Sequence, residues 1–464
     1  MSLDFSMSNI SGLNSTEKRA AVSLALVFGL RMLGLFMIMP VFAIYGQSLE
    51  GYSPMWVGIA IGAYGLTQAL LQIPMGMLSD KFGRKPIILI GLVIFCIGSL
   101  VAAYSESVVG VTIGRAIQGM GAIASTVLAL AADVTRDEQR PKVMATIGMC
   151  IGLSFAVSLI LGPVLVDSIG LAGLFNLTAA LALAGMLVVL FIAPNAVSKA
   201  PKGDTRAAPE LIAAMLKDGQ LLRLDVGIFV LHLVITSVFV VLPLMLLNLD
   251  FATSDHWQLY FPTLMLSFFL MVPLIIIGAK NESMKQMYRL SLLLLAGALV
   301  MMYFLQDSFV GLFVAVIVFF TAFNYLEASL PSLIAKFAPA GKKGTAMGIY
   351  SSSQFFGAFW GGILGGVCYQ YFGLSGVFIT STVLVLLWWV YTAGMVNPQV
   401  LKTYTLDANA DDHDSAETMA QHLMALEGVK EAVVIFDDKA AYLKVDAKVF
   451  DMSKARTVLL AGTN

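Results

Sequence analysis

Four side chains that carry a charge, or can acquire one, lie deep inside long apolar runs of the sequence. They are Arg31, Arg115, His232 and Glu327. Charges inside a membrane normally face a cavity or a partner, so these four are the candidates for proton-coupling chemistry. Glu327 is the only acid near the middle of an apolar run. Because burial favours the uncharged form of a carboxyl group, Glu327 is expected to bind and release a proton; the alternative is a permanently protonated, hydrogen-bonded acid.

A second group of charges stands in the short polar stretch GMLSDKFGRK at 76–85, between two apolar runs. Gly76 and Gly83 allow a tight turn because glycine accepts positive φ. Asp80 is a lone acid among cations, so it should have a partner such as a cation or a helix N-terminus. Arg84, in the same stretch, is expected to pair with Asp133, which directly follows the apolar run at about 108–132.

The composition shows what must position these residues. Hydrophobic residues make up 58% of the chain and charged residues only 12%, with a mean hydropathy of +0.85. These values exclude an ordinary soluble protein and indicate a polytopic membrane protein that contacts the lipid bilayer. No basic face is available for nucleic acid, so nucleic acid is not an expected partner.

Twelve apolar segments are long enough to span a bilayer as helices. They lie at about 20–45, 55–77, 86–105, 108–132, 142–166, 171–193, 225–248, 257–279, 288–306, 309–337, 345–371 and 374–396. Lysine and arginine occur only in alternate loops, and the opposite loops hold acids alone. The positive-inside rule therefore predicts a multi-pass topology with both termini in the cytoplasm.

Composition also divides the chain. We predict a six-helix half at 1–194, a central cytoplasmic linker at 195–224, a second six-helix half at 225–397 and a cytosolic domain at 398–464. A polar linker between two sets of six helices is expected of a two-halved transporter.

The last segment has the pattern of a small α+β domain. We predict the order βαββα, with a strand at 401–406, a helix capped by the box Asp414 to Glu417, a hairpin turned at 437–439 and a last helix at about 453–461. The order resembles the ferredoxin-like fold of heavy-metal-associated domains. The Cys pair of those domains is missing, so we expect neither a metal nor any other cofactor.

The stretch at 76–85 resembles the pattern G-x-L-x-D-x-x-G-R-[KR] between helices 2 and 3 of the major facilitator superfamily. Arg115 lies in a sequence similar to that family's helix 4 motif R-x-x-Q-G, where the Arg is linked with proton movement. Gly162 and Pro163 resemble the start of the G-P-x-x-G-G motif of proton-driven antiporters, although Val166 and Asp167 replace its last two glycines. The resemblance implies an all-α membrane protein of twelve helices in two halves, followed by the small α+β domain.

The resemblance also implies roles for individual residues. In the family pattern the position of Asp80 faces the start of helix 11, here Gly344, so that the two halves are held together on the cytoplasmic side. The implied conformational latch consists of Gly76, Asp80, Gly83, Arg84, Asp133 and Gly344. The implied walls of the substrate cavity include Met32, Met39, Tyr64, Gln118, Asn324, Tyr350 and Gln354.

The function that follows from the resemblance is secondary active transport by alternating access in a bacterial inner membrane, without enzymatic activity. The expected partners are protons and a small amphiphilic substrate that is exported. The C-terminal domain is expected to bind a small ligand or to mediate self-association. The alternative is a membrane-bound sensor that does not transport and uses this domain as its output module.

Overall fold

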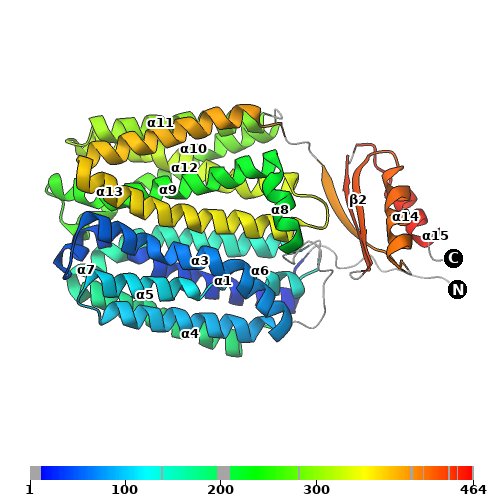
Figure 1. The fold of residues 1–464 in the computed structure, drawn as a ribbon, viewed down its shortest axis with the longest axis horizontal. Coiled ribbons are helices and arrows are strands. Elements are labelled where there is room, and N and C mark those ends of the chain that lie inside the picture. Colours follow the sequence, from blue (N-terminus) through cyan, green and yellow to red (C-terminus); the bar gives the residue numbers. More distant parts are fainter. Residues whose placement is uncertain are drawn as a thin grey trace.

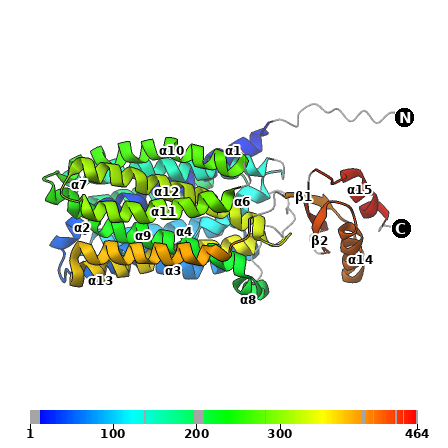
Figure 2. The same cartoon turned by 90° about the horizontal axis from the view of Figure 1, so that it is seen from above.

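The computed structural model describes residues 12–136, 139–195, 209–280, 283–397, 401–410, 412–436, 439–446 and 448–461. Long helices run side by side in one bundle, and a small domain with a sheet sits against one end of it (Figures 1 and 2). We call this end of the bundle the domain end and the opposite end the far end.

Two halves of the bundle follow one another in the sequence. The helices of the first half are α1 (Ser15–Met37), α2 (Met39–Tyr45), α3 (Pro54–Phe82), α4 (Arg84–Ala103), α5 (Val108–Met120), α6 (Ala124–Asp133) and α7 (Arg140–Phe191). The helices of the second half are α9 (Gly219–Asn248), α10 (Trp257–Lys280), α11 (Met284–Phe304), α12 (Phe309–Phe337) and α13 (Lys343–Tyr391).

Among the described residues, ten helical segments are long and apolar enough to cross a membrane. Two of them, which contain α7 and α13, are 52 residues long, and each of these helices bends back at a glycine. Gly170 has φ 68° and Gly373 has φ 63°, a conformation that glycine adopts without steric cost. Each long segment thus supplies two crossings, and the twelve predicted crossings are confirmed.

The fourth crossing is interrupted where the sequence predicts a continuous helix over 108–132. Helix α5 ends at Met120 and α6 begins at Ala124, so residues 121–123 are not helical. The interruption has a packing reason, since a Cβ at Gly121 would lie 2.3 Å from the Gly91 carbonyl oxygen. Interrupted helices leave backbone groups without helical partners and occur in transporters near the middle of the membrane.

The two halves meet most closely along α3 and the first part of α13. A Cβ at Gly58 would lie 2.0 Å from the carbonyl oxygen of Gly362, and one at Gly62 would lie 2.6 Å from that of Phe359. Small residues let helix backbones approach to this distance. Since α3 starts at the far end, these contacts close the seam between the halves there.

The region between the halves contains a helix that the sequence prediction treats as linker. Helix α8 covers Pro209–Lys217, and α9 already begins at Gly219, with Asp218 as its N-cap, before the predicted start at 225. The residues from 196 to 208 lie outside the described part of the chain.

The C-terminal domain has the predicted order βαββα. Its elements are β1 (Lys402–Asp407), α14 (His413–Met424), β2 (Val429–Ile435), β3 (Ala440–Val445) and α15 (Met452–Ala461). The sheet order is β1-β3-β2 with both pairs antiparallel, so β3 is the central strand. The predicted turn residues 437 and 438 lie outside the described residues.

The predicted capping box of α14 is displaced by two residues. The N-cap is Asp412, whose side chain accepts a hydrogen bond from the Ser415 backbone N–H, while the Ser415 hydroxyl receives one from the Asp412 backbone. Asp414 lies in the first helical turn instead. The hydrogen bonds from Ser415 lower the pKa of the exposed Asp412 carboxyl group below its ordinary value, because they favour its charged form.

The sheet of this domain packs against the loop between α12 and α13. The Glu431 carboxylate accepts a hydrogen bond of 3.0 Å from the Ala340 backbone N–H. Lys444, only 3% exposed, donates to the Lys336 carbonyl oxygen at 3.1 Å and pairs with Glu431 at 3.3 Å. Tyr442 packs with Ala340 in a small apolar cluster. The domain is therefore docked on the second half of the bundle.

Candidate functional site

Three polar side chains from three helices meet inside the second half. His232 comes from α9, Glu327 from α12 and Gln354 from α13. The His232 Nε2 atom lies 3.1 Å from Glu327 Oε2, and the Gln354 Nε2 atom lies 2.7 Å from His232 Nε2 and 3.0 Å from Glu327 Oε1. We call these three residues the His-Glu-Gln cluster.

The geometry of the cluster defines a place for one proton. The Gln354 amide has two N–H donors and uses one for each of its two partners. The His232 Nε2 atom has one lone pair, so without a proton it accepts from Gln354 and its contact with Glu327 Oε2 is not a hydrogen bond. With a proton on Nε2, His232 no longer accepts from Gln354 and donates instead to Glu327 Oε2 at 3.1 Å.

The cluster is open to its surroundings in part. The Glu327 side chain is 36% exposed and that of His232 is 20% exposed, although both residues lie well inside their helices. On its far-end side lies a layer of aromatic rings that joins the halves. The contacting pairs are Phe36–Phe155, Phe155–Phe239 and Phe155–Phe320, with ring centroids 5.2, 6.5 and 6.4 Å apart.

The position of this aromatic layer follows from the helix directions. Phe239 lies about two turns beyond His232 on α9, which runs from the domain end to the far end. Phe320 lies about two turns before Glu327 on α12, which runs the opposite way. The layer thus separates the His-Glu-Gln cluster from the far end, where the glycine contacts close the seam.

Arg31 does not reach this cluster. Its Nη2 atom donates to Gln68 Oε1 at 2.8 Å and to the Gly121 carbonyl oxygen at 2.9 Å, within the first half. The second bond satisfies a carbonyl group that the interrupted helix leaves open. The guanidinium stacks between the rings of Tyr64 and Phe95, at 5.7 and 5.3 Å.

Arg115 also stays within the first half. It donates to Gln118 Oε1 at 3.0 Å and to the Ile61 carbonyl oxygen at 3.2 Å, and its guanidinium lies 5.5 Å from the Tyr64 ring. Gln118 in turn donates to the Ser99 hydroxyl at 2.8 Å. The four charged residues singled out in the sequence therefore form two groups, with His232 and Glu327 together and the two arginines around Tyr64.

The residues predicted to line a cavity differ in exposure. Partly exposed are Met39, Asn324 and Gln354. Buried are Met32, Tyr64, Gln118 and Tyr350. Gln118 is fully buried and directed at Ser99, so in this conformation it belongs to the interior of the first half and lines no cavity.

The stretch at 76–85 forms a charge cluster at the domain end. Arg84 pairs with Asp80 at 2.7 Å and with Asp133 at 2.9 Å, so the predicted Arg84–Asp133 ion pair is present. Arg84 also donates to the Ser79 hydroxyl at 2.7 Å. Gly83 separates α3 from α4 with φ 94°, which explains the glycine there.

Gly76 and Gly344 occupy different places around this charge cluster. A Cβ at Gly76 would lie 3.1 Å from the Ser125 hydroxyl, so this glycine allows α3 to pack on α6. Gly344 is the second residue of α13, where backbone N–H groups have no partner within the helix.

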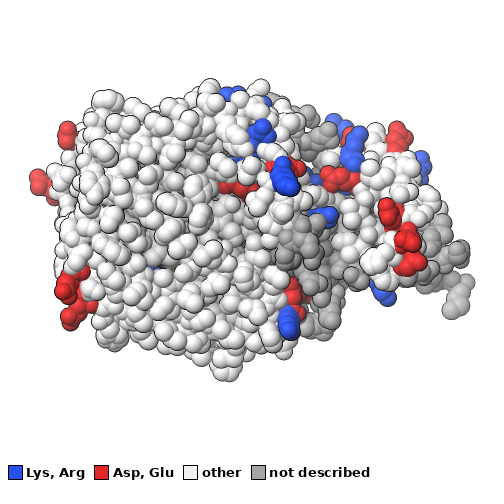
Figure 3. Space-filling view, viewed as in Figure 1, with Lys and Arg blue, Asp and Glu red and all other residues white. Residues whose placement is uncertain are grey.

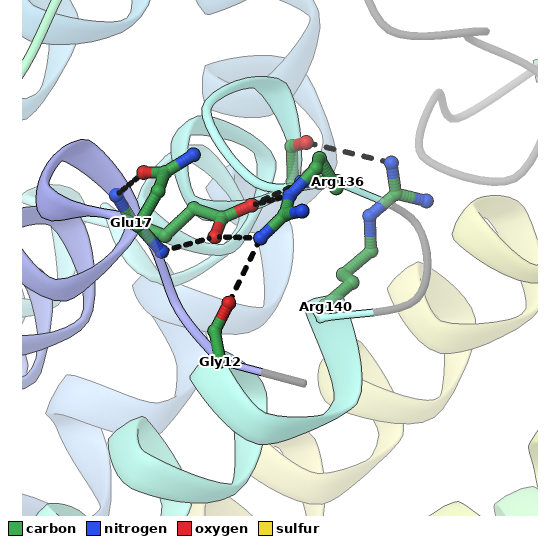
Figure 4. Close-up of polar contacts among 6 residues, drawn as sticks. Gly12, Glu17, Arg136 and Arg140 are labelled. Carbon is green, nitrogen blue, oxygen red and sulfur yellow. Dashed lines mark hydrogen bonds and ion pairs between the residues drawn. The ribbon is translucent and has the colours of Figure 1, made fainter. Parts of the chain in front are cut away.

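A second ion pair at the domain end was not predicted from the sequence. Glu17, 1% exposed, accepts from the Arg136 side chain at 2.8 Å and from its backbone N–H at 3.0 Å (Figure 4). Arg136 also donates to the Gly12 carbonyl oxygen. The contact ties the start of α1 to the loop before α7. The only signal in the sequence was the capping pair Asn14 and Glu17, which both lie before the first apolar run.

A buried acid also escaped the sequence analysis. Asp225 was placed at the beginning of a helix, but α9 starts earlier, so Asp225 lies nearly two turns inside it and is only 5% exposed. Asp225 and His232 are seven positions apart, so they lie on the same face of one helix. This spacing is the sequence signal that could have identified Asp225.

Charge is distributed unevenly between the two ends. On the face drawn in Figure 3, the lysines and arginines lie near the domain end and the far end carries acids. Within the part of the chain that the structure describes, no group of three His, Cys, Asp or Glu side chains is arranged to hold a metal ion.

Comparison with known proteins identifies the family. The model of the Major Facilitator Superfamily matches residues 24–323 and 283–403, and that of the YajR YAM domain matches residues 408–456. The chain belongs to the major facilitator superfamily. It is 41% identical over 433 residues to the inner membrane transport protein YajR of Escherichia coli, which covers 93% of this chain and 95% of the relative. The protein is thus a multi-pass inner-membrane transporter of this superfamily with an appended YAM domain.

More distant matches within the superfamily agree with this assignment. The multidrug resistance protein MdtH of Aeromonas salmonicida is 25% identical over 76% of this chain and 88% of its own length. Among solved structures, a bacterial homologue of the human lysosomal transporter Spinster, in an inward-facing and unoccupied conformation, aligns with a TM-score of 0.65. It covers 82% of this chain and 97% of that structure at 14% identity, so it bears on the fold alone.

Proposed function

We propose that this transporter couples export of a small amphiphilic substrate to protons, and that the His-Glu-Gln cluster is the proton-binding site. The observation that carries the proposal is the Glu327–His232 contact of 3.1 Å, with the Gln354 amide nitrogen within hydrogen-bond distance of both residues. A proton between them neutralises the only described carboxylate that is both deep in a crossing and partly exposed. Protonation thereby changes the charge of the substrate region.

The orientation in the membrane follows from the charges. The loops at the domain end hold the lysines and arginines, so we assign this end and both termini to the cytoplasm. The glycine seam and the aromatic layer then lie on the outer side of the cluster. A substrate reaches the site from the cytoplasm in this conformation, which is the loading step of an exporter.

The charge cluster at the domain end serves in this proposal as a conformational latch. Asp80 and Asp133 share the guanidinium of Arg84 within the first half, and in the family pattern the position of Asp80 faces the start of α13 near Gly344. A carboxylate is stabilised at a helix N-terminus by the helix dipole. When the domain ends of α3 and α13 approach one another, a contact of Asp80 with the N–H groups at the start of α13 would favour the state closed to the cytoplasm.

The proposed substrate is an amphiphilic molecule because the groups around the cluster are mixed in character. Asn324, about one turn before Glu327 on α12, donates to the Ser267 hydroxyl at 2.8 Å and remains partly exposed. The aromatic layer supplies an apolar boundary. Soft and aromatic walls accept ligands of varied shape. The name of the MdtH relative, a multidrug resistance protein, supports the same class.

A sensor without transport remains the second candidate, and one observation favours it. The C-terminal domain is docked through Glu431 and Lys444 on the loop between α12 and α13. Helix α12 carries Glu327 of the cluster, and α13 carries both Gln354 of the cluster and Gly344 of the latch. A domain in this place could report the state of the bundle. In the transporter, the same contact would regulate the movement of α12 and α13.

The two functions are separated by transport in proteoliposomes. The purified full-length chain would be reconstituted with a trapped pH-sensitive dye, and a panel of fluorescent amphiphilic cations and anions would be tested under an imposed pH gradient. Coupled transport predicts that a panel compound accumulates against its gradient and that protons move with it. Neither accumulation nor counterflow for any compound, with the protein folded, would favour the sensor.

A further inference from the structure

Asp225 is a buried acid that the proposed mechanism has not used. Its side chain is 5% exposed, and its Oδ1 atom has no hydrogen-bond partner among the described residues. It lies between the domain end of α9 and His232, roughly 10 Å along the helix axis from the latter. An acid in this position stands between the cytoplasm and the His-Glu-Gln cluster.

Two buried hydroxyl groups accompany Asp225. The Tyr350 hydroxyl from α13 and the Tyr288 hydroxyl from α11 also have no hydrogen-bond partner among the described residues. Tyr350 lies about one helical turn before Gln354 on α13, on the domain-end side of the residue that contacts Glu327. The Tyr288 hydroxyl lies beside α9, 2.8 Å from where a Cβ of Gly227 would stand.

The clustering of these groups has an energetic consequence. A buried polar group without a hydrogen bond costs roughly 1–3 kcal/mol, so several together are expected to share ordered water. A tyrosine hydroxyl donates and accepts at the same time, and a carboxyl group binds a proton, so the set has the parts of a proton path. The nearest cation on the same helix, Arg223, is engaged elsewhere, with the Gly219 and Tyr391 carbonyl oxygens.

We infer that Asp225 and Tyr350 form the path by which protons pass between Glu327 and the cytoplasm. The inference rests on the proposed role of Glu327. In the release step the O–H bond of Glu327 breaks and its proton passes through an ordered water molecule to the Tyr350 hydroxyl oxygen. The proton of that hydroxyl leaves at the same time and, through a second ordered water molecule, an O–H bond forms on the carboxylate of Asp225. One proton moves, no electron is transferred, and Asp225 then releases the proton to the cytoplasm.

The test is infrared difference spectroscopy on the full-length protein in lipid nanodiscs after a pH jump, with water as the only proton source. The unaltered chain should show carbonyl bands from two carboxyl groups that become protonated. Glu327→Gln should remove one band and Asp225→Asn the other. In Asp225→Asn and in Tyr350→Phe, protonation of Glu327 should be slower by about a hundredfold. Asp225→Glu should restore the rate, and Asp307→Asn, at an exposed far-end position, should leave both bands and the rate unchanged.

The outcomes separate the inference from the proposed function. An unchanged band and rate in both Asp225→Asn and Tyr350→Phe, while Glu327→Gln still loses its band, would overturn the proton path and leave the proposed function standing. If Glu327→Gln loses no band, the proposed function fails and the inference fails with it. Using Tyr350→Phe as well keeps the test decisive should Asp225→Asn fold poorly.

Discussion

Glu327 Oε2 lies 3.1 Å from His232 Nε2, although the two residues are 95 positions apart in the chain and belong to α12 and α9. The Gln354 Nε2 atom on α13 donates to Glu327 Oε1 at 3.0 Å and lies 2.7 Å from His232 Nε2. The contact depends on the packing of three helices of one half. In the proposed mechanism, a movement of α12 or α13 would change the affinity of the cluster for a proton, and this would link proton binding to alternating access.

The first prediction concerns the latch. Asp80→Asn removes the charge that pairs with Arg84, whereas Lys81→Gln removes an exposed charge of the same stretch. A charge-assisted hydrogen bond is worth roughly 1.5–3 kcal/mol, so the balance of states should shift by about tenfold or more toward the state open to the cytoplasm. Spin labels at the domain ends of α3 and α13 should move apart in Asp80→Asn only. Equal distances in the two variants would mean that the charges of the stretch at 76–85 only set the membrane topology.

The second prediction concerns the seam at the far end. Gly58→Ala places a methyl group 2.0 Å from the Gly362 carbonyl oxygen, so α3 and α13 must separate there. The state open to the far end should gain population, and labels on the far ends of these helices should report a longer distance. Gly152→Ala is the matched control, because no atom lies within 4 Å of its Cβ position. The same distance in the two variants would show that the seam does not control opening.

The third prediction concerns the docked domain. Lys444→Met removes the bond to the Lys336 carbonyl oxygen and leaves Glu431 without its cation. Hydrogen exchange in the loop 338–342 should become faster, since the domain is held less often on the bundle. Lys448→Met alters an exposed residue of the same domain and should have no effect. Unchanged exchange in both variants would mean that apolar packing alone holds the domain.

The fourth prediction concerns pH. The lowered pKa of Asp412 means that its cap stabilises α14 when the carboxyl group is ionised. This contribution is present above the unfolded pKa of about 3.9 and is lost as the pH falls through the folded value. Asparagine also caps helices, so Asp412→Asn should keep α14 at neutral pH and flatten its acid-induced loss of protection. An acid transition identical to that of the unaltered chain would place the pH dependence elsewhere.

The sequence predicted the fold well because long apolar runs and turn glycines are local signals. Gly170 and Gly373 each lie between two membrane crossings, and both fall between two of the apolar segments predicted from the sequence. The interruption at Gly121 could not be seen, since it depends on the approach of Gly91 from another helix and on the bond from Arg31. A helix interruption that is caused by tertiary packing does not alter the hydrophobic periodicity of the sequence.

The candidate site was predicted in part for the same reason. Glu327 and His232 stand out in the sequence because charge is rare inside apolar runs. His232 and Glu327 meet because of the helix packing within the second half. Arg31 and Arg115 lie around Tyr64 because of the helix packing within the first half, and neither packing can be read from the sequence. Asp225 escaped because its depth depends on where α9 begins, and helix starts are the least certain feature of a sequence pattern.

The central claim is that the Glu327 carboxyl group carries the coupled proton. The decisive measurement uses proteoliposomes containing Glu327→Gln and, as control, Glu106→Gln, which changes an exposed acid at the far end. Proton-driven accumulation of the compound that the unaltered chain transports should fall by about a hundredfold or more in Glu327→Gln, while counterflow exchange of that compound continues. Glu106→Gln should match the unaltered chain in both assays. Accumulation against a gradient by Glu327→Gln at the unaltered rate would contradict the claim.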